Sequence, residues 1–165
     1  EYFAWLITER ENLPYNEDKI REGVRAMLRG NIQPFMKMVE DVLNILSNRD
    51  YQNFDEKYIK VLIIAYIIQT NTYYTPSERE TPAGYIDLLF IAPTDKKTDY
   101  EYIFELKYLK KSDASEQKII QAKQEAKTQI LQYVQADPTL RNRKSLYAFT
   151  LVFVKNKLLI DPVEL

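Results

Sequence analysis

Several residue types that support common enzyme chemistry are missing from this chain of 165 residues. It has no cysteine, which excludes disulfides, thiolate nucleophiles and zinc–sulfur sites. It has no histidine, which excludes the commonest general base and the commonest transition-metal ligand. With only three glycines, neither a phosphate-binding P-loop nor a dinucleotide fingerprint can be written. Any chemistry must therefore use carboxylates, lysines, hydroxyls and amides, which suit a hard cation such as Mg²⁺ or Mn²⁺.

Long hydrophobic runs are also missing. The longest apolar run, residues 61–68, suits a buried helix and is too short to cross a bilayer. No signal peptide is visible, so we expect a cytoplasmic protein that does not enter a membrane. Because the chain opens on Glu1 rather than methionine, we expect it to be part of a longer polypeptide. Its length suits one domain, or one domain with an extension.

Hydrophobic periodicity predicts an α/β fold with a mixed β-sheet core flanked by helices. Residues 1–50 are predicted to form a helical extension or connector, and residues 51–165 the domain that carries the sheet. The expected elements are helices over 16–30, 32–48 and 55–70, a short strand near 72–75, strands over 84–92 and 100–108, a helix over about 113–136, and strands over 145–154 and 157–160. The helix over 55–70 is apolar almost all round, so we expect it to be largely buried.

The strands over 84–92 and 100–108 each carry one acidic residue among apolar neighbours. These residues are Asp87 and Glu105. A hairpin symmetric about Lys96 would place the two acids directly opposite each other, with Cβ atoms roughly 4.5–5.5 Å apart. Like charges in such a position are destabilising, so either one carboxyl group takes up a proton or a cation sits between them.

A lysine joins this pair. Period-two alternation places Lys107 on the same face as Glu105, so two carboxylates and an ammonium would converge at one end of a sheet. The competing interpretation is a solvated acid and lysine on an amphipathic hairpin. Leu89 shares the face of Asp87, and Ile103 shares the face of Glu105. These apolar neighbours favour a covered site.

The ordered motifs G-Y-I-D and F-E-L-K resemble the signature of the PD-(D/E)XK nuclease superfamily, with Ile86 in place of the proline. The helix over 55–70 is preceded by Phe54 and opens with D-E-K-Y, where Glu56 matches the helical acid that often completes the metal site. The later helix contains Q-I-L-Q-Y, where Gln129 and Tyr133 match the Q-x-x-x-Y element of several branches. Taken alone, that last pair is equally typical of a core glutamine beside a packing tyrosine.

The run SERETPAGYIDLLF, together with FELKYLK, is most similar to one branch of this superfamily. That branch is the nuclease-like domain at the C-terminus of bacterial proteins whose N-terminal part is an AAA-type ATPase-like domain. The resemblance covers roughly residues 54–160, and residues 16–48 are similar to the helical connector there. It implies a restriction-endonuclease-like fold, and an ATPase-like domain as a partner in the same longer chain.

The resemblance implies a Mg²⁺-dependent nuclease that hydrolyses phosphodiester bonds of nucleic acid, with DNA as the expected substrate. Asp87, Glu105 and the main-chain carbonyl of Leu106 would hold Mg²⁺ or Mn²⁺. Glu56 would reach the ion directly or through water. Lys107 would orient the attacking water or stabilise charge on the phosphorane oxygens. Asp87, Glu105 and Lys107 are therefore the expected catalytic residues.

Other residues would assist. Gln129 and Tyr133 would position the substrate backbone, or the helix itself. Glu78 and Glu80, which precede the Asp87 strand, are reserve candidates. Several lysines could contact phosphates, although a solvated helix face explains them equally well; they are Lys110, Lys111, Lys118, Lys123 and Lys127. Acidic residues dominate 61–106 and basic residues dominate 107–165, which suits metal ligands beside a phosphodiester-binding surface and also an ordinary mixed surface.

Two other functions stay open. A nuclease fold that has lost turnover could hold nucleic acid, or dock a protein partner, behind an ATPase. A plain interaction domain could instead pair its carboxylates with lysines and bind no metal. Its tyrosine-rich segments, such as NTYYT and DYEYIF, would then be partner surfaces, because aromatic side chains are enriched at interfaces.

Overall fold

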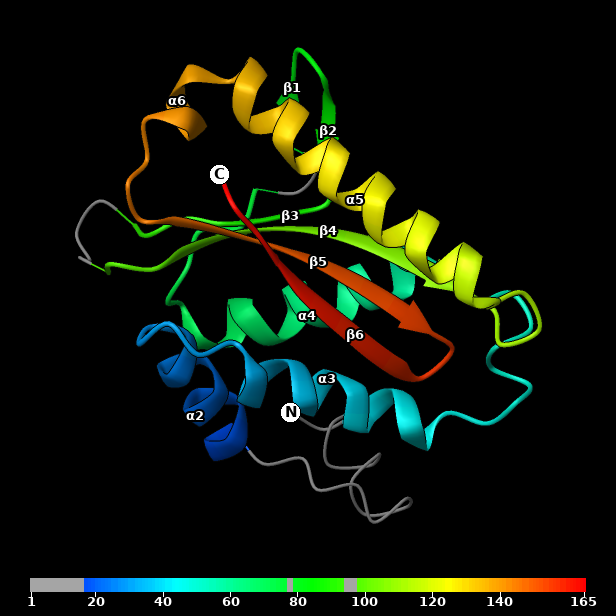
Figure 1. Ribbon diagram of the computed structural model, residues 1–165. Helices are drawn as coiled ribbons and strands as arrows, with labels where there is room; N and C mark the ends of the chain where they lie inside the picture. Colours follow the sequence, from blue (N-terminus) through cyan, green and yellow to red (C-terminus); the bar gives the residue numbers. More distant parts are fainter. Residues whose placement is uncertain (1–16, 77–78, 94–97) are drawn as a thin grey trace.

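The computed structural model describes residues 17–76, 79–93 and 98–165 (Figure 1). Its helices and strands, in chain order, are α2 (Glu17–Met27), α3 (Gln33–Ile45), α4 (Glu56–Thr70), β1 (Arg79–Thr81), β2 (Gly84–Ile86), β3 (Leu88–Phe90), β4 (Glu101–Leu109), α5 (Glu116–Ala136), α6 (Pro138–Arg141), β5 (Leu146–Val154) and β6 (Lys157–Val163). Helices thus precede the strands, and α5 connects β4 to the last two strands.

Four strands form one mixed sheet in the order β3-β4-β5-β6. β4 and β5 run parallel, and both outer pairs are antiparallel. A parallel pair needs a crossover connection, which α5 supplies. β1 and β2 form a separate antiparallel pair. Figure 1 shows α5 across one face of the four-stranded sheet, with α3 and α4 across the other, so helices cover both faces.

Each face of the sheet has its own hydrophobic core. Alternation along β4 sends Phe104 and Leu106 into the larger core, which also contains residues of α2, α3 and α4. The same alternation sends Ile103 into the smaller core, which it shares with Ile130 of α5. We refer to the smaller one as the core under α5. Residues of β4 with odd numbers in this stretch therefore face α5.

Local sequence sets the helix ends. α4 begins after Asp55, whose side chain accepts a hydrogen bond at 2.9 Å from a backbone N–H of the first turn. It ends at Asn71, which adopts the left-handed conformation that asparagine tolerates. α5 begins after Ser115, which caps it in the same way. It ends before Asp137, because the residue preceding Pro138 is biased away from helix.

The predicted mixed sheet with flanking helices and helices at the N-terminal side is confirmed. Other elements differ from prediction. The strand expected over 84–92 is interrupted at Asp87, so that β2 and β3 belong to different sheets. Near residues 72–75 there is a single β-bridge, between Tyr74 and Ile91. β1 and α6 were not predicted, and the last strand is longer than expected.

The prediction that α4 is largely buried is wrong. Its buried side chains form one stripe, Ile59, Ile63 and Ile67. Val61 and Ile68 point outward and are 65% and 62% exposed. A helix at the edge of a domain covers the core with one stripe only, whatever the polarity of its other faces. Within the described ranges, no helix is long and apolar enough to cross a membrane.

Candidate active site

Asp87, Glu105 and Glu56 approach one another where β4 continues past the first residue of β3. Along the described chain, β3 pairs with β4 only at positions 102–104. Beyond this point, the N–H groups on that edge of β4 need other acceptors. The Leu106 N–H donates to Asp87 Oδ2 at 2.9 Å, and the Tyr108 N–H donates to Glu56 Oε1 at 3.0 Å. Two carboxylates from distant segments thus replace the carbonyl groups of a neighbouring strand.

Asp87 directly precedes β3, and its charge acts on Glu105. The pairing of β3 with β4 ends at Leu88 and Phe104, one residue from each of the two acids. Glu105 lies on the α5 face of the sheet, because its alternation partner Ile103 belongs to the core under α5. The two acids lie near each other, and their direct cross-strand pairing stays a prediction, because the pairing of β3 with β4 ends at Leu88 and Phe104. The turn itself, residues 94–97, lies outside the described residues.

The interruption at Asp87 explains how this side chain reaches β4. Ile86 and Leu89 both pack in the core under α5, whereas Leu88 packs in the larger core. Alternation is thus shifted by one residue at Asp87, as it is at a β-bulge. Gly84, at the start of β2, has a φ of 130° and lies against the Tyr133 ring, so the backbone turns away from β4 at a position suited to glycine.

Glu105 is the most deeply buried acid of the site, with 3% of its surface exposed. Its Oε1 accepts a hydrogen bond from Lys107 Nζ at 3.2 Å, so the predicted acid–lysine contact is present. Its Oε2 is buried and has no hydrogen-bond partner among the described residues. Burial, the largest cause, together with the Asp87 charge raises the pKa of Glu105 to about 8, although Lys107 opposes both. The single lysine contact therefore does not offset the burial of this carboxyl group and the charge of Asp87.

Glu56 belongs to the same electrostatic group. Burial raises the pKa of Glu56, while the hydrogen bond from the Tyr108 N–H and the Lys107 charge lower it; the Asp87 charge raises it. The first turn of α4 therefore brings this acid within reach of the sheet residues. This position agrees with the role that the sequence resemblance implies for it.

Gln129 and Tyr133 approach the acids from α5. Gln129 Nε2 donates to the Tyr133 hydroxyl at 3.4 Å, one helical turn along. Tyr133 is buried in the core under α5. Burial raises the pKa of Tyr133 to about 12, and the charges of Glu105 and Asp87 raise it too. The structure thus brings Tyr133 near the two acids, and Gln129 contacts Tyr133.

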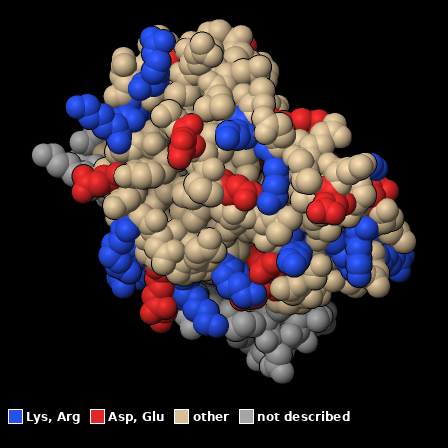
Figure 2. Space-filling model, viewed as in Figure 1, with Lys and Arg blue, Asp and Glu red and all other residues tan. Residues whose placement is uncertain are grey.

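The reserve residues and lysines are less closely associated with the site. Glu80 lies exposed on β1, opposite Tyr85, and Glu78 lies outside the described residues. Lys123 pairs with Asp161 of β6 at 2.8 Å, near the opposite edge of the sheet. The other four candidate lysines are exposed. On the face shown in Figure 2, basic side chains are interspersed with acidic ones and form no continuous basic patch.

The donor chemistry fits a hard divalent cation. It consists of carboxylate oxygens, one of which, Glu105 Oε2, is buried and without a partner in the described chain. Leu106 places its carbonyl on the same edge as its N–H, which already contacts Asp87. In the arrangement seen, no three acidic side chains of the described ranges converge closely enough to hold an ion. Instead, Asp87 and Glu56 each accept a hydrogen bond from a backbone N–H with one carboxylate oxygen.

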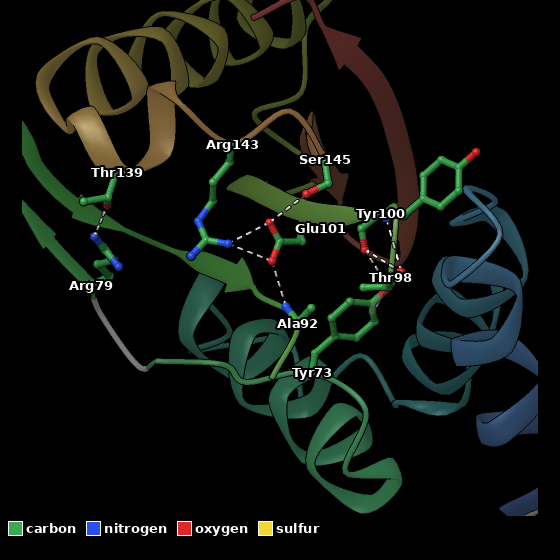
Figure 3. A network of polar contacts seen from close by, with 9 residues as sticks. All are labelled: Tyr73, Arg79, Ala92, Thr98, Tyr100, Glu101, Thr139, Arg143 and Ser145. Carbon is green, nitrogen blue, oxygen red and sulfur yellow. Dashed lines mark hydrogen bonds and ion pairs between the residues drawn. The ribbon is translucent and has the colours of Figure 1, made fainter. Parts of the chain in front are cut away.

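A second buried acid on β4 was not singled out from the sequence. Glu101 accepts hydrogen bonds from Arg143 Nη1 on both oxygens, at 2.8 and 2.9 Å, and from Ser145 and the Ala92 N–H (Figure 3). These contacts tie the starts of β4 and β5 to the end of β3. Unlike Glu105, this acid has partners for both oxygens, which indicates a structural role. The sequence feature that could have identified Glu101 as a buried acid is its position within the otherwise apolar run Y-E-Y-I-F.

Comparison with known proteins tests the resemblance seen in the sequence. No curated protein and no solved structure matches the chain. A protein-family model described as the PD-(D/E)XK nuclease superfamily matches residues 54–162, which is more than half of the chain. The matched segment begins just before α4 and ends in β6, so it includes the sheet, α5 and the acidic pair. The chain therefore belongs to the PD-(D/E)XK nuclease superfamily.

Proposed function

We propose that this domain is a Mg²⁺-dependent nuclease that hydrolyses phosphodiester bonds, with DNA as its substrate. Membership in the superfamily supports the reaction class. The observation that carries the proposal is the buried Glu105 carboxylate, which lies near Asp87, contacts Lys107 and keeps one oxygen unpaired among the described residues. A buried acid pair with too little positive charge is the environment in which a divalent cation binds well.

The proposed ion ligands are Asp87, Glu105 and the carbonyl of Leu106, with Glu56 at the ion or one water away. When bound, Mg²⁺ or Mn²⁺ supplies a Lewis acid for the phosphate and for an attacking water. The Leu106 and Tyr108 N–H groups keep Asp87 and Glu56 at the edge of β4, which limits the freedom of both side chains.

Lys107 is the proposed catalytic cation. Its side chain is 19% exposed, and its ammonium group donates one hydrogen bond to Glu105 Oε1. The ammonium group has three donors, so the others can hold a water or a phosphate oxygen. The partly open position gives substrate access. Lys107 would therefore position the water or stabilise the negative charge that develops on phosphate.

Gln129 and Tyr133 are the proposed substrate-positioning residues. Their mutual hydrogen bond orients the glutamine amide, and the influence of the Glu105 and Asp87 charges on Tyr133 supports a position close to the substrate phosphate. We also propose that residues 1–50 connect this domain to an ATPase-like domain of the same longer chain, and that the protein acts in the cytoplasm. The resemblance of residues 54–160 to nuclease-like domains of such proteins supports these assignments.

Two substitutions test the nuclease proposal. We expect Asp87→Asn and Lys107→Ala to reduce Mg²⁺-dependent cleavage of plasmid and single-stranded DNA by at least ~100-fold. Circular dichroism should show an unchanged fold. Asp41→Asn is a suitable control, because Asp41 lies on α3 in an exposed ion pair with Lys37. Cleavage by both site variants at the rate of the parent would show that these residues are not the site.

A second candidate function is a nuclease-fold module that holds nucleic acid without cutting it. The observation in its favour is that Asp87 and Glu56 contact backbone N–H groups and do not converge with Glu105 within the described part of the chain. Binding of Mn²⁺ or DNA without cleavage would favour this function. Absence of both kinds of binding would favour a plain interaction domain.

A further inference from the structure

Two buried side-chain oxygens of the described residues, Glu105 Oε2 and Thr150 Oγ1, lack a hydrogen-bond partner, and a third buried oxygen, Asp161 Oδ2, has Lys123 Nζ at 2.8 Å. They are neighbours. Glu105 of β4 is the register partner of Thr150 in the parallel β4–β5 pair, and Thr150 is the register partner of Asp161 in the antiparallel β5–β6 pair. Since adjacent strands lie about 4.8 Å apart, the three side chains form one row across the sheet.

This row lies on the α5 face of the sheet. Glu105 faces α5, and register partners on neighbouring strands point to the same face. α5 crosses over the row between two contact points. At one end, Lys123 Nζ is 2.8 Å from Asp161 Oδ2, and at the other, Tyr133 lies within electrostatic reach of Glu105. Ala126 lies between these points along the helix and is fully buried.

The three oxygens have complementary hydrogen-bonding capacity. Glu105 and Asp161 are acceptors, and Lys123 already compensates the charge of Asp161. Thr150, which is 1% exposed, has the hydroxyl donor between them. The hydroxyl makes no direct hydrogen bond to either carboxylate in the structure. Buried water typically makes about three hydrogen bonds to buried polar groups, and this row offers two unsatisfied oxygens beside the lysine-paired Asp161.

We propose that Thr150 is a positioning residue for Glu105, acting through one buried water. The Thr150 hydroxyl donates to this water, which donates in turn to Glu105 Oε2 and Asp161 Oδ2. Lys107 holds Oε1 of the same carboxyl group, so the group is oriented from both sides. Hydrogen bonds of this kind orient metal-binding carboxylates and typically change metal affinity 10–100-fold. The inference rests on the proposed metal role of Glu105.

Isosteric substitution separates this role from a merely structural one. Thr150→Val removes the hydroxyl at constant volume, and Thr150→Ser keeps it. Phe153→Leu is a matched control on β5, because Phe153 is buried in the larger core on the opposite face. We expect Thr150→Val to weaken Mn²⁺ binding about 10-fold in calorimetry. Thr150→Ser and Phe153→Leu should bind Mn²⁺ within about 2-fold of the parent, even though Phe153→Leu is less stable.

A second readout needs no metal. In EDTA, Thr150→Val should have a lower urea midpoint than Thr150→Ser, because it leaves the water without one of its partners. Thr150→Ala replaces Thr150→Val in both measurements if the valine variant does not fold. Parent-like Mn²⁺ affinity of Thr150→Val, or a urea midpoint of that variant above the parent, would overturn the inference. Equal loss of affinity in the serine variant would overturn it too.

The outcomes also distinguish this inference from the proposed function. If the parent binds Mn²⁺ and shows the expected variant pattern but cuts no nucleic acid, the nuclease proposal fails and the role of Thr150 stands. If the parent binds no Mn²⁺, and Glu105→Gln gives the same calorimetric result, both the metal role of Glu105 and the positioning role of Thr150 are overturned.

Discussion

Glu101 and Glu105 are both buried on β4, but their hydrogen-bond partners differ. Glu101 has Arg143, Ser145 and a backbone N–H for its two oxygens. Glu105 has one lysine contact on Oε1 and an acid nearby. The strand pattern alone does not distinguish them, because both alternate with apolar residues. Their partners come from distant segments and decide which acid stabilises the fold and which is available for an ion.

The raised pKa of Glu105 predicts how stability depends on pH. The folded-state pKa is about 8, against an ordinary value of 4.5. Its contribution to stability is therefore complete below about pH 4.5 and is lost as pH rises through 8. In EDTA, urea unfolding should show the parent losing on the order of 3 kcal/mol between pH 5 and pH 9 relative to Glu105→Gln. A constant difference across this range would contradict the prediction.

Glu101→Gln provides the opposite case on the same strand. Removing this charge leaves the Arg143 guanidinium without its carboxylate partner, so we expect a loss of about 3 kcal/mol in the free energy of unfolding at pH 7. At the same pH, Glu105→Gln should stabilise the metal-free protein. Urea unfolding of both variants in EDTA checks the two signs, and destabilisation of similar size in both would contradict the assignment.

At the scale of elements, short connections are fixed by side chains from elsewhere. Asp137 follows α5 and caps α6, where it accepts hydrogen bonds from Thr139. Arg79 of β1 donates to Asp137 Oδ2 at 2.7 Å, so the small β1–β2 pair is attached to the end of α5. Helix α6 was not predicted because its four residues carry no periodic signal. The one sign of this helix in the sequence is the pair Asp137-Pro138, an N-cap residue followed by a proline at the first helical position.

Asp137→Asn tests this attachment. Burial raises the pKa of Asp137, but hydrogen bonds from Thr139 and Arg79 outweigh that effect and lower it to about 2. The group therefore stabilises the fold above about pH 3.8 and less as pH falls towards 2. Asparagine retains the cap and loses the charge. We expect it to cost about 1–2 kcal/mol at pH 7 and less at pH 3, measured by urea unfolding. An equal cost at both values would rule out the ionic contribution.

At the scale of the whole molecule, the N-terminal helices and the sheet share one core. Tyr102 of β4 is buried and donates to the Met27 carbonyl of α2 at 2.6 Å. The backbone N–H of Leu158 on β6 donates to Glu40 of α3 at 3.0 Å. Residues of α2, α3, α4 and the sheet belong to the larger core together. Because these elements bury one another's apolar surface, we expect the described residues to unfold as one cooperative unit.

Tyr102→Phe tests this cooperativity. It leaves the Met27 carbonyl buried without its donor and should reduce the free energy of unfolding by about 1–3 kcal/mol. Circular dichroism and tyrosine fluorescence should still report a single, coincident transition. Two separated transitions, in either the parent or the variant, would show that the helices and the sheet are independent folding units.

The sequence by itself determined the mixed sheet with flanking helices, and it predicted that Asp87 and Glu105 approach each other. Both follow from local properties, because alternation and the symmetry of one short hairpin define strand face and register. Only the tertiary structure decided where β2 leaves the sheet, which acid is fully paired, and that Thr150 lies between Glu105 and Asp161. These features depend on contacts between segments far apart in the chain, which packing fixes and local pattern does not encode.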